Sequence, residues 1–196
     1  MGTQKIQDAL RAPRPIAPPG FVWQLYGDAA FLKPAAWHER ERVSTTDAID
    51  PMTVSTYTVS HDPLCEETEF EIGLTAQVIR DSKKILGIDA KQMARGYLEH
   101  FLSACKKEEV LRLERYIKGG RECTFFRFTY TPPSQKPGIV HKFILANKVT
   151  DCVHVFSFES PAPSWDENWA QYGAPIFRQL LADSILPVPF TGNNVH

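Results

Sequence analysis

In the first half of the chain, the pattern of hydrophobic residues is typical of β-strands. Residues 70–78, FEIGLTAQV, alternate apolar and polar positions, so that Phe70, Ile72, Leu74, Ala76 and Val78 share one face. Residues 53–60, TVSTYTVS, are rich in β-branched side chains and predict a second strand. The segments VWQLY at 22–26 and AAFLK at 29–33 flank the turn-prone Gly27-Asp28 pair and predict a β-hairpin.

The period changes to that of a helix over residues 89–105. Asp89 is a suitable N-cap, and Gln92 stands three positions later, which is the spacing of a capping box. Apolar residues recur every three or four positions behind it: Met93, Tyr97, Leu98, Phe101, Leu102 and Cys105. The pattern predicts an amphipathic helix with this stripe facing the core.

Four further strands follow, at 109–117, 122–130, 139–146 and 152–159, with turn signals between them at 119–120, 132–138 and 147–148. Connections this short allow consecutive strands to pair only antiparallel. The strand at 122–130 places Phe126, Phe128 and Tyr130 on one face and Phe125 on the other. We expect most of these rings in the core, with one left to line a binding groove.

The C-terminal apolar pattern predicts a helix over SWDENWAQYGAPIFRQLLADSIL, residues 164–186 in outline, opening on a Ser164 to Glu167 capping box. Its apolar face comprises Trp165, Trp169, Tyr172, Ile176, Leu180 and Leu181. Pro175 should bend or split this helix, because proline lacks the amide donor of the helical ladder.

Together these elements predict an α+β fold, a mainly antiparallel sheet covered by the central helix and the C-terminal helix. Residues 11–20, RAPRPIAPPG, lack apolar periodicity and amide donors. Residues 1–20 are therefore predicted to form a Pro-rich tail or linker, and residues 21–190 a single domain. A chain of 196 residues is long enough to bury such a core without disulfides.

Charge and hydropathy exclude several classes of protein. The 22 lysines and arginines nearly balance the 23 aspartates and glutamates, and the formal net charge is −1, which argues against a nucleic-acid partner. No apolar run reaches the roughly 18 residues of a membrane span, and the N-terminus lacks the apolar region of a signal peptide. The sequence predicts a soluble, cytoplasmic protein.

The segment FLKPAAWHERER at 31–42 is interpreted as a structural corner. Pro34 breaks the strand ladder, and Trp37 has the largest apolar surface nearby. The alternation that follows is typical of an exposed strand, so His38 is expected to point outward with Glu39 and Glu41.

Candidate metal ligands are few. Cys65, Cys105, Cys123 and Cys152 lie far apart without zinc-finger spacing and are interpreted as free thiols. If the turn after Ala146 is centred near Lys148 and Val149, His141 and His154 become diagonal neighbours on one sheet face. Cys152 is the nearest further donor, but a zinc site needs three or four ligands in register. We expect no metal and no cofactor.

Candidate catalytic groups are weak as well. His61 and Cys65 flank the loop HDPLC, which fixes neither a base nor an orienting group for a thiolate, so a surface loop is the simpler interpretation. The acidic run formed by Glu66, Glu67, Glu69 and Glu71 is explained by a solvated strand edge. No nucleophile-elbow, zincin or phosphate-binding motif is present. The sequence thus predicts no catalytic, cofactor-binding or metal-binding residues, and a protein that is not an enzyme.

The order of elements and two short motifs resemble the PsbP and Mog family of α/β sandwich proteins, from about Phe21 to Ile185. The Pro34-Ala35-Ala36-Trp37 corner is similar to the Pro-x-x-Trp corner of that family, and Ser184-Ile185 to the pair on which its last helix closes. The chain departs from the smallest members by its Pro-rich N-terminus and by residues 45–52. No partner-binding residue can be carried over from a matching motif.

The resemblance implies a non-catalytic protein. Members of the family bind unrelated partners, including the photosystem II core, the Ran GTPase and secreted effectors that they chaperone. We therefore expect an accessory or chaperone-like protein that binds a protein partner through its surface. The alternative is a carrier of a small apolar ligand in a cavity between the sheet and the C-terminal helix.

Overall fold

The computed structural model describes residues 14–45, 53–64, 71–106, 109–131, 137–183 and 185. The chain groups into two compact units, one formed by the segments up to Trp37 and from Asp166 onward, the other by His38–Trp165. Both are built on antiparallel sheets with few helices, so the fold is α+β as predicted. The single domain over residues 21–190 stays a prediction.

The first unit contains a three-stranded sheet. The predicted hairpin is present as β1 (Phe21–Tyr26) and β2 (Ala29–Pro34), and Gly27 in the turn has a positive φ of 56° that glycine adopts without strain. A short strand, β10 (Leu181–Ala182), pairs with the other side of β2. The helix α5 (Ala174–Arg178) packs against β2.

The C-terminal helix is irregular next to Pro175: the backbone is helical from Trp165 to Arg178 without a break, but a π-helical turn directly precedes Ala174. It comprises the turn η2 (Ala162–Ser164), α4 (Trp165–Asn168), the π-helical turn η3 (Trp169–Gly173) and α5, with Pro175 in the first turn of α5. Ser164 directly precedes α4, and its hydroxyl donates to the Pro161 carbonyl at 3.5 Å; its capping box with Glu167 stays a prediction. One detail of the prediction is wrong: the helix ends at Arg178, because Leu181 and Ala182 pair with β2.

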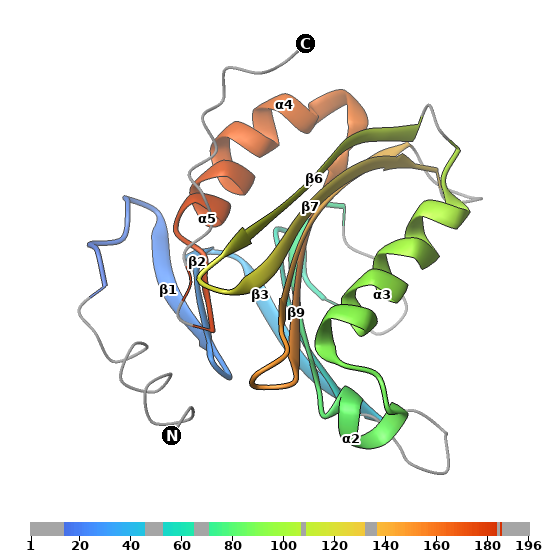
Figure 1. Ribbon diagram of the computed structural model, residues 1–196. Coiled ribbons are helices and arrows are strands. Elements are labelled where there is room, and N and C mark those ends of the chain that lie inside the picture. Colours follow the sequence, from blue (N-terminus) through green and yellow to red (C-terminus); the bar gives the residue numbers. More distant parts are fainter. Residues whose placement is uncertain are drawn as a thin grey trace. The chain divides into compact units, whose positions relative to one another are not determined.

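The second unit contains a seven-stranded sheet (Figure 1). Its strands are β3 (His38–Thr45), β4 (Thr53–Ser60), β5 (Gly73–Arg80), β6 (Val110–Lys118), β7 (Arg121–Tyr130), β8 (Gly138–Asn147) and β9 (Cys152–Pro161). The order across the sheet is β3-β4-β5-β9-β8-β7-β6, and every neighbouring pair is antiparallel. The predicted meander is confirmed, and it leaves β6 at one edge.

Two helices lie between β5 and β6. The short α2 (Ser82–Leu86) was not predicted, whereas α3 (Ala90–Ala104) matches the predicted amphipathic helix. The Asp89 side chain accepts from the Gln92 amide at 3.0 Å, and the Gln92 side chain accepts from the Asp89 amide at 2.9 Å. The capping box is therefore confirmed, and it satisfies two amides that the first helical turn leaves unpaired.

Helix α3 covers β8 and β9 on one face of the sheet (Figure 1). The buried residues at this interface are Ala90, Ala94 and Leu98 from the helix and Ile79, Phe126, Phe128, Val140, Ile144, Ala146, Val153 and Val155 from the sheet. All six residues of the predicted stripe contribute to this core. Leu98 is buried, and the other five are partly buried. Of the aromatic residues of β7, Phe125 is buried on the opposite face and Tyr130 is exposed.

The predicted corner is present. The Trp37 ring is buried and lies 5.1 Å from the Tyr172 ring, centre to centre, while the Trp37 amide donates to the Pro34 carbonyl at 3.0 Å. His38, Glu39 and Glu41 are exposed on β3, as expected. Within the described segments, no helix is both long and apolar enough to cross a membrane.

Candidate partner-binding edge

Strand β6 combines an open backbone edge with exposed apolar side chains. It pairs with β7 on one side, and among the described residues no strand pairs with its other side. Every second amide and carbonyl along that outer side therefore points away from the ladder and can be satisfied by another polypeptide or by water. The strand at the other edge of the sheet, β3, carries charged residues at positions 39–42.

Three large apolar residues of β6 are exposed. Leu111, Leu113 and Ile117 have exposed fractions of 49%, 41% and 70%. Leu113 is paired with Phe126 and Ile117 with Glu122, so both point to the face that α3 covers farther along the sheet. The helix packs on β8 and β9, and Leu113 and Ile117 of β6 are left uncovered on this face.

The opposite face of β6 is charged and aromatic. Arg112 and Glu114 form an ion pair along the strand, with a nitrogen–oxygen distance of 2.7 Å. The Tyr116 ring lies 6.0 Å from the Phe125 ring of β7. The ring contact and the ladder hold β6 against β7, so the edge presents a defined backbone instead of a loose segment.

The start of β6 is irregular. The register with β7 shifts between Val110 and Arg112, which leaves Leu111 as the extra residue of a β-bulge. From Arg112 to Lys118 the pairing is regular. The stretch that a partner strand could follow without distortion is therefore the part of β6 after the bulge.

An ion-pair network fixes α3 to β7 next to this edge. Arg95 donates to both carboxylate oxygens of Glu122 at 3.1 and 3.0 Å, and the Lys91 ammonium lies 3.7 Å from the same carboxylate. The hydrogen bond from Arg95 is the largest cause that lowers the pKa of Glu122. Because Glu122 is the neighbour of Ile117 across the strands, the network borders the exposed apolar positions.

The expected proximity of His141 and His154 is wrong. Strand β8 ends at Asn147, which pairs with Cys152, so the turn is centred between Val149 and Thr150, one residue later than assumed. His141 consequently pairs with Phe158, and His154 pairs with Leu145. The two imidazoles share a face but stand four residues apart along the ladder, about 13 Å at the rise of a strand.

His141 is fully buried and held in a fixed orientation. Its ring stacks on Phe125 at 5.4 Å, and the Arg127 Nε donates to His141 Nδ1 at 3.4 Å. Burial, followed by the positive charges of Arg127 and Arg112, holds the pKa of His141 well below its ordinary value of 6.5. His141 is thus a neutral imidazole at physiological pH.

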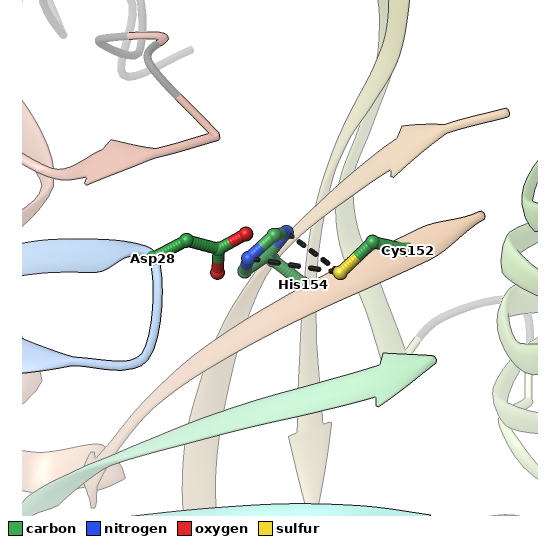
Figure 2. Close-up of side chains that lie close together, drawn as sticks. All are labelled: Asp28, Cys152 and His154. Carbon is green, nitrogen blue, oxygen red and sulfur yellow. Dashed lines mark hydrogen bonds between the residues drawn. The ribbon is translucent and has the colours of Figure 1, made fainter. Parts of the chain in front are cut away.

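Cys152 and His154 lie side by side on β9 (Figure 2). The Cys152 sulfur is 3.7 Å from Nδ1 and 3.9 Å from Nε2 of His154, and both residues are buried. They share a face because they are two positions apart on one strand. Asp28, also drawn in Figure 2, belongs to the first unit, and two donors on one strand do not complete a zinc site.

The other candidate chemistry falls partly outside the described residues. Cys65, Glu66, Glu67, Glu69 and the closing Ser184 lie there. His61 is exposed and its Nδ1 is 3.1 Å from the Asp62 carboxylate, and Glu71 is exposed. The three cysteines that are described, Cys105, Cys123 and Cys152, are free, as expected.

Sequence reasoning missed a buried lysine beneath α3. The Lys142 ammonium donates to the Ser157 hydroxyl at 2.7 Å and lies 4.5 Å from the centre of the Phe101 ring. Burial is the main cause that lowers the pKa of Lys142, while the charge of Glu159 opposes it. The signal in the sequence was Lys142 between Val140 and Ile144, a single charge on an otherwise apolar strand face.

The exposed positions of β6 were also missed. The sequence LRLERYIK predicted a strand with alternating apolar and charged residues. This pattern is the same for a strand inside a sheet and for a strand at its edge. Only the order of the strands identifies Leu113 and Ile117 as exposed.

Comparisons with known proteins give a distant likeness. No family model and no curated protein sequence matches the chain. Among solved structures, the chain is similar to that of cyanobacterial PsbP (CyanoP) from Synechocystis sp. PCC 6803, at a TM-score of 0.48 and 10% identity, over 87% of this chain and 97% of that one. The likeness is one of fold, and it carries no argument about what this protein does.

Proposed function

We propose that this protein is a non-catalytic binding protein that docks a polypeptide partner along the open edge of β6. The observation that carries the proposal is the coincidence, on one strand, of a backbone edge that no described strand covers and the exposed side chains of Leu113 and Ile117. Addition of a strand to such an edge uses main-chain hydrogen bonds for affinity and alternate side chains for specificity.

The polar features of β6 favour selective docking. Open edges are a risk of aggregation, and bulges and charged residues limit it. β6 has both, a bulge at Leu111 and the charged residues Arg112, Glu114, Arg115 and Lys118. A partner strand must match this charge pattern in order to pair, so the edge selects its partner instead of accepting any extended segment.

The test is a comparison of three forms of the tagged protein in pull-downs from the native lysate. Leu113→Lys places a charge at the centre of the edge. Leu86→Lys is the matched control, because Leu86 is a leucine on α2 with a similar exposed fraction, 47% against 41% for Leu113. We expect a protein that is retained at fixed stoichiometry by the wild type and by Leu86→Lys and is lost from Leu113→Lys.

Hydrogen exchange of the retained complex adds a second measurement. Strand addition should protect backbone amides of β6 that exchange in the free protein. If Leu113→Lys retains the same proteins as the wild type, and the exchange of β6 is unchanged on binding, β6 is not the docking site. The alternative role, a carrier of a small apolar ligand, stays a prediction.

A further inference from the structure

We infer that the strand which fits the β6 edge is β6 of a second copy of this chain, paired antiparallel about a twofold axis at Leu113. This inference rests on the proposed function of the edge and names its partner. It follows from the charge pattern of β6 and from its exposed leucines, because the register about Leu113 opposes unlike charges and brings the leucines into the interface.

Geometry limits the registers that two copies can use. When two identical antiparallel strands are related by a twofold axis, residues at equal distances before and after the axis stand opposite each other, and opposite residues share a face. When the axis passes through a residue, the side chains on the Leu113 face of one copy therefore meet those on the Leu113 face of the other copy. The side chains on the Arg112 face meet in the same way.

With the axis at Leu113, the two Leu113 side chains meet and each Arg112 stands opposite the Glu114 of the other copy. Within one copy Arg112 already lies beside its own Glu114 at 2.7 Å. The four charges then alternate in sign both along and across the strands. On the other face each Leu111 stands opposite the aliphatic stem of Arg115, which covers exposed apolar surface.

Neighbouring registers are less favourable. An axis at Glu114 sets the two Glu114 carboxylates opposite each other. An axis at Arg115 sets the two Arg115 guanidinium groups opposite each other and each Arg112 opposite Lys118. Like charges directly opposite destabilise a strand pair. An axis at Tyr116 opposes Glu114 to Lys118, but it sets Leu113 opposite Gly119, where the chain turns back into β7, so the exposed leucines stay outside the interface.

The dimer should be weak and reversible. The regular part of β6 begins only at Arg112, so about Leu113 the undistorted pairing spans Arg112–Glu114 in each copy, and Leu111 opposite Arg115 lies at the bulge. Pairing along one short strand buries less than the roughly 1,600 Å² of a standard interface, and a dissociation constant on the order of 10–100 µM is expected. Analytical ultracentrifugation of the purified full-length chain over this range measures it directly.

Two charge reversals give the decisive experiment. Arg112→Glu sets an introduced carboxylate opposite the native Glu114 of the other copy, and Glu114→Arg sets an introduced guanidinium opposite the native Arg112. Each variant alone should therefore weaken self-association at least about tenfold. Mixed in equal amounts, the two variants present opposite charges at both positions. The mixture should form a one-to-one heterodimer with wild-type affinity, and the double variant Arg112→Glu, Glu114→Arg should again form a homodimer.

Controls keep the outcomes distinct. Lys84→Glu makes the same change of charge on α2 and should dimerise as the wild type does. Circular dichroism and thermal melting confirm that each variant is folded. If the wild type remains a monomer at about 500 µM, well above that expected constant, or if both single variants dimerise as the wild type does, the inference is wrong. A monomer that still loses its lysate partner through Leu113→Lys would leave the proposed function standing.

Discussion

At the scale of single residues, Gly173 shows how closely the first unit is packed. A methyl group added at Gly173 would overlap Cε3 of the Trp169 ring, closer than any van der Waals contact. The φ of Gly173 is −59°, so the position excludes a larger residue by space and not by backbone conformation. The π-helical turn Trp169–Gly173 thus requires a glycine where the ring folds back on the helix.

We predict that Gly173→Ala lowers the free energy of unfolding by about 1–3 kcal/mol, the usual cost of overpacking. Gly96→Ala is the matched control, because Gly96 lies inside α3 with no atom within 4 Å of the added methyl group. That change should stabilise the protein by about 0.5–1 kcal/mol, since alanine favours a helix. Denaturation midpoints at constant slope measure both, and a neutral Gly173→Ala would contradict the packing.

His141 gives a prediction of pH dependence. Its pKa is lowered by burial in the folded protein, so below the ordinary value of 6.5 the unfolded chain binds a proton that the folded protein does not. Folding stability should then fall as the pH drops below about 6.5, by up to about 1.4 kcal/mol per pH unit. Chemical denaturation at pH 8, 7, 6 and 5 measures the slope.

The variant His141→Gln removes the titrating group while keeping a polar side chain next to Arg127. We expect it to be less stable than the wild type at pH 8 but to lose less stability between pH 7 and pH 5. An unchanged slope would assign the acid sensitivity to other groups. His38→Gln, an exposed residue on β3, is the control for the substitution itself.

At the scale of elements, the contact of α3 with the sheet depends on an aromatic ring above a buried charge. Phe101 lies 5.9 Å from Phe128 and 4.5 Å from the Lys142 ammonium, so it contributes both apolar burial and a cation–π contact. Lys142 in turn would be an uncompensated buried charge without Phe101, Ser157 and the charge of Glu159.

We predict that Phe101→Ala destabilises the protein by about 3 kcal/mol, since a large ring is lost from the interface of helix and sheet. A double-mutant cycle with Phe101→Leu and Lys142→Met isolates the contact between the two side chains. Its coupling energy should be about 0.5–2 kcal/mol, the range of a cation–π contact from exposed to desolvated. A coupling energy near zero would show that the ring acts through apolar packing alone.

At the scale of the whole molecule, the first unit is assembled from the two ends of the chain. Strands β1 and β2 come before the second unit in sequence, and β10 and α5 come after it. A small three-stranded sheet is marginally stable by itself. If the second unit unfolds, closing the loop between these two ends costs entropy that grows with the length of the unfolded chain.

We therefore predict one cooperative thermal transition for the whole protein. Of the four tryptophans, Trp23, Trp37 and Trp169 belong to the first unit, and only Trp165 belongs to the second. Tryptophan fluorescence thus reports mainly the first unit, whereas far-ultraviolet circular dichroism reports mainly the seven-stranded sheet. The two curves should have the same midpoint, and separate midpoints would show that the units unfold independently.

The sequence by itself determined the local elements, because their physics is local. Period-two alternation predicts β5, β-branched side chains predict β4, and turn signals separate the strands of the meander. The Asp89 and Gln92 side chains define the start of α3, and Pro175 marks the irregular part of the C-terminal helix. Each of these features depends on residues that are close together in the sequence. The short α2 escaped detection, because five residues are too few for a periodic pattern.

Only the tertiary structure decided which strand lies at an edge and which side chains meet across strands. The shift of one residue in the turn between β8 and β9 moved His154 from a neighbour of His141 to a position four residues away, because register is set by the turn geometry. The exposed leucines of β6 and the buried Lys142 depend on strand order and on the placement of α3. These are contacts between segments far apart in sequence, which no periodic pattern encodes.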